Sequence, residues 1–406
     1  MPTTRPTDPP RARPYGIPRG LRRDGPVLFS YGFRPFFLGA GVFAVVAMAL
    51  WIGALTAGLP IGGAYGAAGW HAHEMLFGFA PAVLAGFLMT AIPNWTGQMP
   101  LAGRPLAMLA GLWLAGRVAM LAAGVVGAPV AAAVDAAFLP ALATACAREL
   151  IAGKKWKDLK VLVGVAVIAA ANIGFHAEVL LSGAPGMAAR AGVAGFALLV
   201  TIIGGRIIPS FTRNWLAMAG ASRLPVAFNG QDGVAIGVGL VGLVAWVVAP
   251  EGWPTAAAAL VAAVAVAWRL SRWRGAATWR EPLLLVLHVA FGFLGLGFVA
   301  IAAAALGWLP QAAAMHVLTV GGIAGTMLAV MTRATRGHTG RPLVASRWTQ
   351  ASYLCLFGAA LARPAADLAG DPRLLDLAGG LWIAAFLLFL AEYAPMLLLD
   401  RQRSMR

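Results

Sequence analysis

Long apolar runs separated by short polar connections make up most of this chain. A membrane-spanning helix needs about 20 apolar residues at about 1.5 Å per residue, and most of the runs have that length. The runs cover residues 33–57, 70–92, 105–124, 128–147, 159–181, 187–208, 233–249, 254–270, 281–306, 312–332, 349–362 and 375–398. The pattern predicts an all-α, polytopic membrane helical bundle of twelve transmembrane helices. This bundle is expected to form one domain, residues 31–400, between a disordered basic cytoplasmic tail (1–30) and a short tail (401–406).

The composition agrees with this pattern and affects how the positive net charge is interpreted. Hydrophobic residues make up 60% of the chain, charged residues make up 11%, and the mean hydropathy is +0.79. Soluble domains carry about 25% charged residues, so the chain is predicted to be an integral membrane protein. The net charge of +16 would suggest nucleic acid in a soluble protein. Here the charge lies in short loops between apolar runs, and no nucleic-acid partner is expected.

The basic residues lie on alternate connections between the apolar runs. With a cytoplasmic N-terminus, 27 of the 31 lysine and arginine residues fall on the inner side. The four others are Arg117, Arg190, Arg363 and Arg373. Because cytoplasmic loops are enriched in lysine and arginine, we expect twelve spans with both termini in the cytoplasm.

The ends of three apolar runs resemble one another. Residues 85–97 close the second run, residues 204–215 the sixth, and residues 324–333 the tenth, each with glycine and threonine near a helix exit. A recurrence every four spans predicts three pseudo-repeated units of four helices. The alternative is that glycine, threonine and proline end these helices independently.

Residues 69–78 place three ionisable side chains, His71, His73 and Glu74, at the start of the second run. Such groups are costly inside a membrane unless they are paired or ligated, so the stretch is a candidate functional site. On a helix His71 and Glu74 share a face, whereas His73 points about 200° away from His71. We therefore expect His71 with Glu74 to form one site and His73 to face another partner. The alternative is an unwound helix start that lets both histidines bind one ion.

The other histidines differ in depth. His176 and His316 lie near the outer side, as the His71/His73 pair does, whereas His288 lies about 10 Å in from the inner side and His338 in an inner loop. Imidazole is a common ligand of haem iron and copper, so the candidate cofactor-binding residues are His71, His73, Glu74, His176, His288 and His316. The candidate metal ligands among them are His71, His73, His176 and His316. A lone histidine such as His288 can equally bond a neighbouring helix, and His338 is expected to bind no cofactor.

Other motifs narrow the chemistry. Asp135 and Glu178 lie in the outer halves of their spans, with Arg117 and Arg190 available to form structural ion pairs with them. The sequence has no phosphate-binding loop, dinucleotide fingerprint, zinc-protease motif or CxxCH motif. Nucleotide binding, proteolysis and covalent haem attachment therefore find no support.

Four motifs in series resemble the NnrS family. They are YGFRPFF at 31–37, WHAHEMLFG at 70–78 with PNWTG at 93–97, GRIIPSFT at 205–212, and VMTRA followed by GHTGR within 330–341. The resemblance covers nearly the whole chain apart from the N-terminal tail. It implies a multi-pass protein of the bacterial inner membrane that carries haem b and copper. It also implies a role in nitric oxide metabolism and resistance to nitrosative stress, often beside denitrification genes.

The predicted architecture is also similar to the catalytic subunits of haem-copper oxidases and nitric oxide reductases. In those proteins a His-x-His pair on one helix serves two haems on opposite faces. Here the pair, His71 and His73, lies on the second span rather than the tenth, and no adjacent His-His pair is present. The similarity is therefore used for the fold alone.

Two functions are consistent with these features. In the first, the protein binds haem and copper and binds or turns over nitric oxide, or a related small molecule, on the periplasmic side. In the alternative, a non-catalytic transporter or metal-handling protein uses the same histidines for copper or protons. The expected partners are this small molecule and the lipid bilayer, and the sequence indicates no protein partner.

Overall fold

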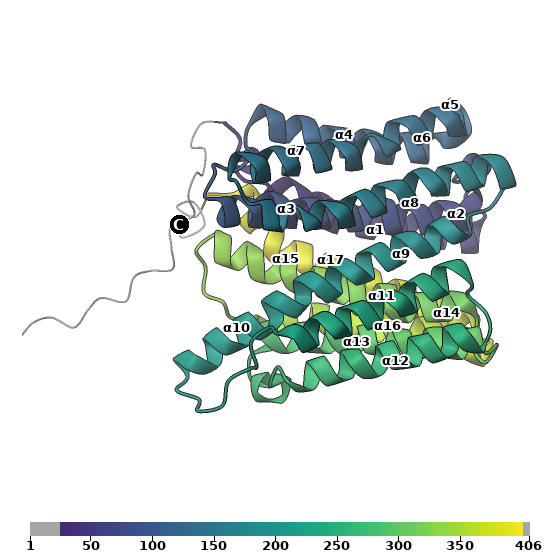
Figure 1. Cartoon of the computed structure of the whole chain (residues 1–406). Coiled ribbons are helices and arrows are strands. Elements are labelled where there is room, and N and C mark those ends of the chain that lie inside the picture. Colours follow the sequence, from purple (N-terminus) through teal and green to yellow (C-terminus); the bar gives the residue numbers. More distant parts are fainter. Residues whose placement is uncertain (1–24, 401–406) are drawn as a thin grey trace, which may run out of the picture.

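The computed structural model describes residues 25–400, and every regular element in that range is a helix. Figure 1 shows the helices lying side by side in one bundle, with their connections at its two ends. The predicted all-α fold is confirmed for this part of the chain. The tails at 1–24 and 401–406 lie outside the described residues.

Eight of the described helices are long and unbroken: α1 (Phe33–Ala57), α4 (Arg104–Leu121), α8 (Lys160–Ser182), α11 (Gly230–Val248), α12 (Trp253–Ser271), α13 (Pro282–Ala305), α16 (Arg347–Ala369) and α17 (Pro372–Leu398). Another span joins α6 (Ala128–Ala136) to α7 (Phe138–Ala152), and the short α5 (Ala123–Val126) precedes it. Single 3₁₀ turns occur at η1 (Val27–Phe29), η2 (Gly63–Tyr65), η4 (Trp156–Asp158) and η6 (Gly275–Thr278).

Three long spans contain a π-helical segment. The first is α2 (Gly66–His73), η3 (Glu74–Phe79) and α3 (Ala80–Thr96); the second is α9 (Met187–Leu199), η5 (Val200–Gly204) and α10 (Gly205–Met218); the third is α14 (Gln311–His316), η7 (Val317–Ala324) and α15 (Gly325–His338). π segments insert an extra residue into a helix and often mark functional sites. These are the same three spans whose ends resemble one another in sequence.

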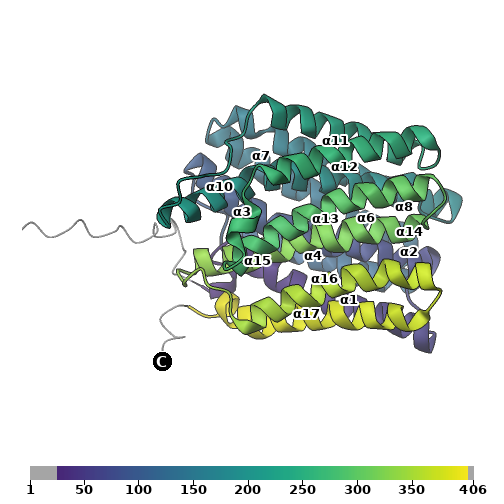
Figure 2. The ribbon, with the colours of Figure 1, turned by 90° about the horizontal axis from the view of Figure 1, so that it is seen from below.

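Eleven helical spans of the described residues are long and apolar enough to cross a membrane. The sequence pattern predicts twelve, and the one that is not among the eleven is α16. This helix has 23 residues and packs along α17, as Figure 2 shows, but it carries Arg347, Arg363 and Asp367. The protein is therefore a multi-pass membrane protein, and the twelfth span stays a prediction.

The connections that follow α3, α7, α10, α12 and α15 lie at the end of the bundle where α17 also ends (Figures 1 and 2). These connections carry Lys154, Lys155, Lys157, Arg223, Arg274, Arg280 and Arg341. We call this end the basic end. The predicted separation of loops rich in lysine and arginine from the other loops is thus present in the fold.

Helix boundaries follow local chemistry. Gly97 and Gly183 end α3 and α8 with left-handed backbones, φ 73° and 79°, which glycine adopts without a Cβ penalty. Residues 27–30 lie within the predicted tail, where Val27–Phe29 form a 3₁₀ turn and the carbonyl of Phe29 accepts a hydrogen bond from Gly103 N at 2.8 Å. Ser30 is buried. The described fold therefore includes a few residues before residue 31.

Candidate metal and cofactor sites

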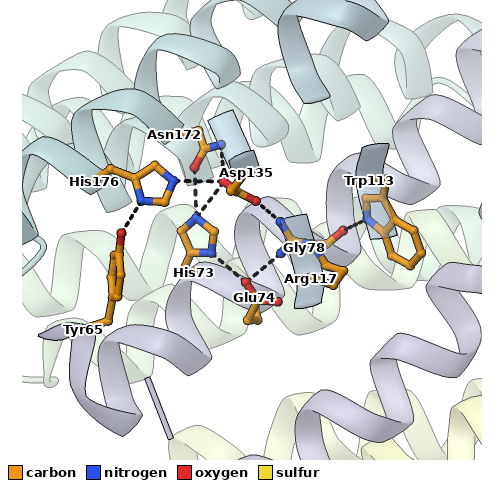
Figure 3. Close-up of polar contacts among 9 residues, drawn as sticks. All are labelled: Tyr65, His73, Glu74, Gly78, Trp113, Arg117, Asp135, Asn172 and His176. Atoms are coloured by element: carbon orange, nitrogen blue, oxygen red, sulfur yellow. Dashed lines mark hydrogen bonds and ion pairs between the residues drawn. The ribbon is translucent and has the colours of Figure 1, made fainter. Parts of the chain in front are cut away.

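A cluster of buried polar side chains lies between the first helices of the bundle, near the end opposite to the basic end (Figure 3). His73 ends α2, Asp135 lies on α6, and His176 lies on α8. All three side chains are buried, and one ligand atom from each lies within 4.8 Å of the other two. The fold thus brings together three spans that are separated in sequence.

Both ring nitrogens of His73 contact polar groups. Nδ1 lies 2.8 Å from Glu74 Oε1, while Nε2 lies 3.0 Å from Asn172 Oδ1 and 3.2 Å from Asp135 Oδ2. The Asn172 side chain also donates from Nδ2 to Asp135 Oδ2 at 2.8 Å, which fixes the direction of its amide. The Nε2 atom of His73 therefore faces two oxygen acceptors.

This arrangement calls for positive charge at Nε2 of His73. A neutral imidazole carries one N–H, and Glu74 accepts it at Nδ1 if the carboxylate is ionised. The remaining Nε2 lone pair would then face the oxygens of Asn172 and Asp135, which is repulsive. A second proton on Nε2, or a cation between Nε2 and the oxygens, removes the conflict.

The charges of the cluster also indicate that a further positive charge is needed. Arg117 on α4 donates from Nη1 to Glu74 Oε1 at 2.6 Å and from Nη2 to Asp135 Oδ1. Two carboxylates and one guanidinium leave one negative charge in excess, in a site where all three groups are buried. Buried charges are stable only when compensated, so a proton or a metal ion completes the site.

The π segment makes room for this ion pair. A Cβ atom on Gly78 would overlap with Nη1 of Arg117, so the guanidinium lies where a side chain is missing. Trp113, one turn before Arg117, donates from Nε1 to the Gly78 carbonyl at 2.9 Å. Glu74 and Gly78 both belong to η3. The π segment therefore positions the carboxylate and also accommodates its partner.

His176 completes the cluster. Its Nε2 lies 2.9 Å from Asp135 Oδ2, and its Nδ1 lies 2.8 Å from the Tyr65 hydroxyl. The hydroxyl can donate to Nδ1 or accept from it, so the ring can adopt either tautomer. With the proton on Nδ1, Nε2 is free to bind a metal ion beside Asp135.

These residues fit a metal ion by the chemistry of their donor set. Two imidazole nitrogens and one carboxylate oxygen suit zinc, copper, iron or nickel. Histidine ligands usually donate their other ring N–H to a carboxylate or a similar group, which fixes ring orientation. Glu74 does this for His73, and Tyr65 can do it for His176. The cluster could therefore hold a metal ion, and its geometry does not identify which one.

A separate cavity of about 260 Å³ lies on the other side of the broken span, and His71 and His316 both line it. Most of its lining is apolar or aromatic, including Met75, Met315 and Trp382. Concave apolar sites with a few polar groups are typical of cofactor pockets. His71 and His73, two residues apart, therefore face different sites.

The two histidines of this cavity differ in how they are held. His316 Nδ1 donates to the carbonyl of Ala312 at 2.7 Å, which leaves Nε2 unprotonated in the neutral ring and able to bind a ligand. The His71 ring stacks on Trp51 with centroids 4.7 Å apart and planes 14° apart. Its Nδ1 is buried and has no hydrogen-bond partner among the described residues. A buried polar atom of this kind fits a site whose ligand would supply the partner.

The predicted pairing of Glu74 with His71 is wrong. Glu74 contacts His73 Nδ1 and Arg117 instead. Glu74 is the first residue of the π segment, and its carboxylate lies between the His73 ring and the guanidinium of Arg117 from α4. His73 and Glu74 therefore point into the same cluster.

The remaining predicted histidines lie elsewhere. His288 is buried on α13, where Nδ1 donates to the Leu284 carbonyl at 3.0 Å and Nε2 lies 3.4 Å from Thr212 Oγ1, so the fold does not bring it to either site. His338 is the last residue of α15 rather than a loop residue, and its ring stacks on Tyr31 with centroids 5.7 Å apart. Burial raises the pKa of the Tyr31 hydroxyl to about 12, so Tyr31 is neutral in this contact.

Of the two predicted ion pairs, one is present in the structure. Arg117 pairs with Asp135 as expected. Glu178 instead accepts hydrogen bonds from the backbone of Gly186 and Ala188 at the start of α9, and Arg190 donates to the carbonyl of Val247. The carboxylate of Glu178 caps a helix N-terminus, where its charge is favourable.

The sequence pattern predicts a structural ion pair for Asp135. It assigns no role to Asn172 or Tyr65. Asn172 precedes His176 by one helical turn, so both side chains lie on one face of α8. That spacing was the available signal, since amide and imidazole groups on one face of an apolar helix mark a polar site. Nothing in the sequence indicates that Tyr65, in the connection before the span, reaches His176.

The comparisons with known proteins agree with the sequence motifs. The family model described as NnrS protein matches residues 27–401, nearly the whole chain. No curated protein matches the chain.

Proposed function

Because the chain belongs to the NnrS family, which supports a role in the nitric oxide response, we propose that it binds haem b and copper and binds or turns over nitric oxide or a related molecule. The observation that carries this proposal is the separation of the histidines into two sites. One site is the cavity lined by His71 and His316, and the other is the cluster of His73, Asp135 and His176.

His71 and His316 are the residues that would hold the haem. Haem b binds through imidazole nitrogens in an apolar pocket, and its iron supplies a site for small uncharged ligands. The apolar wall of the cavity suits a porphyrin, and the Nδ1 hydrogen bond of His316 presents the Nε2 atom for ligation. Arg363, which pairs with Asp367 at 2.7 Å, and Asp376 also line the cavity and are its charged residues.

His73, His176 and Asp135 are the residues that would hold copper. Imidazole and carboxylate ligands suit the divalent copper ion. Glu74 holds the His73 ring through Nδ1, and Arg117 balances the charge of both carboxylates. Nε2 of His73, which faces the oxygens of Asn172 and Asp135, would hold either a proton or the metal ion.

We also infer the topology of the whole protein. The basic end would face the cytoplasm of a bacterial cell, with the chain in the inner membrane, both termini cytoplasmic and both sites in the periplasmic half. Helix α16 would be the twelfth span, because it runs antiparallel beside α17 at the same depth (Figure 2). The spans with π segments are the second, sixth and tenth, which supports three units of four helices.

An absorption spectrum of the purified protein tests the proposed function. Haem b gives a Soret band that shifts on reduction with dithionite and again on addition of nitric oxide, and this band is the expected result. His316→Ala should lose it. His338→Ala is the matched control and should keep it, because His338 stacks on Tyr31 at the basic end.

The same measurement separates the alternative function. The cluster around His73 requires a cation or a proton, which a metal-handling protein or proton-coupled transporter would also use. Colourless protein that contains one metal equivalent per chain would support that alternative. This result would contradict haem binding but would still agree with the proposed metal site.

A further inference from the structure

A second, smaller cavity lies between the three spans that contain π segments. Its volume is about 60 Å³. Its lining residues include Leu84, Phe87, Phe196, Ile203, Thr326 and Met327. They come from α3, from α9 and η5, and from α15, so the cavity lies where all three broken spans meet.

The lining of this cavity is almost entirely apolar. Among the described residues that line it, Thr326 alone is polar, and its hydroxyl donates to the Gly322 carbonyl at 2.8 Å. A buried water needs two to four polar partners, whereas apolar cavities stay dry and bind guests such as xenon. The cavity therefore fits a small uncharged molecule and excludes ions and water.

Met327 lines both this cavity and the histidine cavity. It is the one residue common to the two linings. Methionine has three rotatable bonds and adapts its shape to its surroundings. A change of its rotamer would open or close the wall between the cavities.

The small cavity extends from Met327 toward the basic end. On all three spans its lining continues in that direction, to Phe87, Ile207 and Val330. These three side chains are only half-buried, whereas Leu84 and Phe196 above them are buried. The half-buried residues therefore mark the mouth of the cavity, in the half of the bundle nearer the basic end.

We propose that the small cavity is the entry route by which a small, uncharged, weakly polar molecule, of the size of a diatomic gas, reaches the histidine cavity, and that Met327 is its gate. This proposal deepens the proposed function and rests on it only for the identity of the destination. The route leads from the small cavity, which residues of η5 line, to the histidine cavity, which residues of η7 line. Both cavities would then serve one reaction site.

Xenon tests the route without any cofactor. A structure of the full-length protein under xenon pressure should show xenon in the small cavity of the wild type. Ile203→Trp places a large ring in the cavity from a half-buried position and should abolish that xenon site. Ordered water in the wild-type cavity, or no xenon there, would overturn the proposal.

Met327→Ala should join the two cavities and extend the xenon density into the histidine cavity. Met331→Ala is the matched control, because Met331 lies one turn farther along α15, is buried, and lines neither cavity. It should leave the xenon sites unchanged. If both alanine variants gave the same xenon pattern, Met327 would not be the gate.

Recombination of carbon monoxide after flash photolysis tests the destination. Ile203→Trp should slow recombination from solution about tenfold, which equals about 1.4 kcal/mol on the entry barrier. An unchanged rate, with xenon lost from the small cavity, would show that the ligand enters by another path. Wild-type protein without haem would contradict the proposed function instead, and the xenon results would still decide whether the route exists.

Discussion

His73 Nε2 and Asp135 Oδ2 lie 3.2 Å apart in the buried interior of the bundle, although they belong to different spans. The same carboxylate oxygen accepts a hydrogen bond from Asn172 at 2.8 Å and lies 2.9 Å from His176 Nε2. One oxygen atom is thus the meeting point of three side chains. This convergence makes Asp135 the residue on which the cluster depends.

Replacing Asp135 by asparagine should abolish metal binding and destabilise the protein. The change removes an anionic ligand and leaves the buried Arg117 with Glu74 as its one acidic partner. Breaking a buried ion pair costs about 3–5 kcal/mol. Metal analysis and a thermal unfolding curve, both in detergent, measure the two effects.

Asp232→Asn is the matched control for this variant. Asp232 is buried and pairs with Arg269 and Arg272, far from either histidine site. The Asp232→Asn variant should lower the unfolding temperature about as much as Asp135→Asn does. Its metal content should stay at the wild-type level. Equal metal loss from both variants would mean that the loss reports unfolding, and the assignment of Asp135 as a ligand would fail.

Glu74→Gln should weaken the metal site while the protein keeps its fold. Glutamine can still accept the Nδ1–H of His73, but it no longer carries the charge that orients the ring and raises its basicity. Changes of this kind lower metal affinity by about 10- to 100-fold. Competition with a chelator of known affinity measures the change, and Glu178→Gln, which caps α9, should show wild-type affinity.

Gly78→Ala should displace Arg117 from the cluster. The added Cβ would overlap with the guanidinium, and overpacking of a buried site costs about 1–3 kcal/mol. Gly111→Ala on the neighbouring helix α4 is the control, because its Cβ would meet no atom within 4 Å. Thermal unfolding should show a lower midpoint for the first variant and an equal or higher midpoint for the second. Equal midpoints would contradict the described position of Arg117.

Reporter fusions test the orientation. A reporter that is active only in the cytoplasm should work when fused after the last residue, and also when inserted in the connection after α15. A reporter that is active only outside the cytoplasm should work in the connection between α8 and α9, which carries no lysine or arginine. The reverse pattern would place both histidine sites in the cytoplasmic half.

Much of the fold is predictable from the sequence because each apolar run is a local signal. The helices lie on the predicted runs, although several extend beyond them, as α10 does to Met218 and α16 to Ala369. The basic residues mark one end of the bundle. Helix α16 is the hardest case, since Arg363 and Asp367 lower its hydropathy while pairing with each other at 2.7 Å. The apolar runs themselves do not indicate the π segments within three of the spans.

The site was harder to predict than the fold. The angle between His71 and His73 follows from helix geometry, and the structure places them in different sites. The partner of Glu74 does not follow, since its carboxylate is held by Arg117 from another span. Contacts between spans, such as that of Tyr65 with His176, depend on tertiary packing that spacing in one helix cannot reveal.

His71 and His73 lie in two different sites, and we propose that each site holds its own cofactor. Haem content and metal content per chain, measured on purified His71→Ala and His73→Ala, test it most directly. His71→Ala should lose haem and keep its metal, because His71 lines the cavity with His316. His73→Ala should lose the metal and keep haem, because its ring lies in the cluster with Asp135 and His176. Identical losses of haem and metal from the two variants would contradict the account.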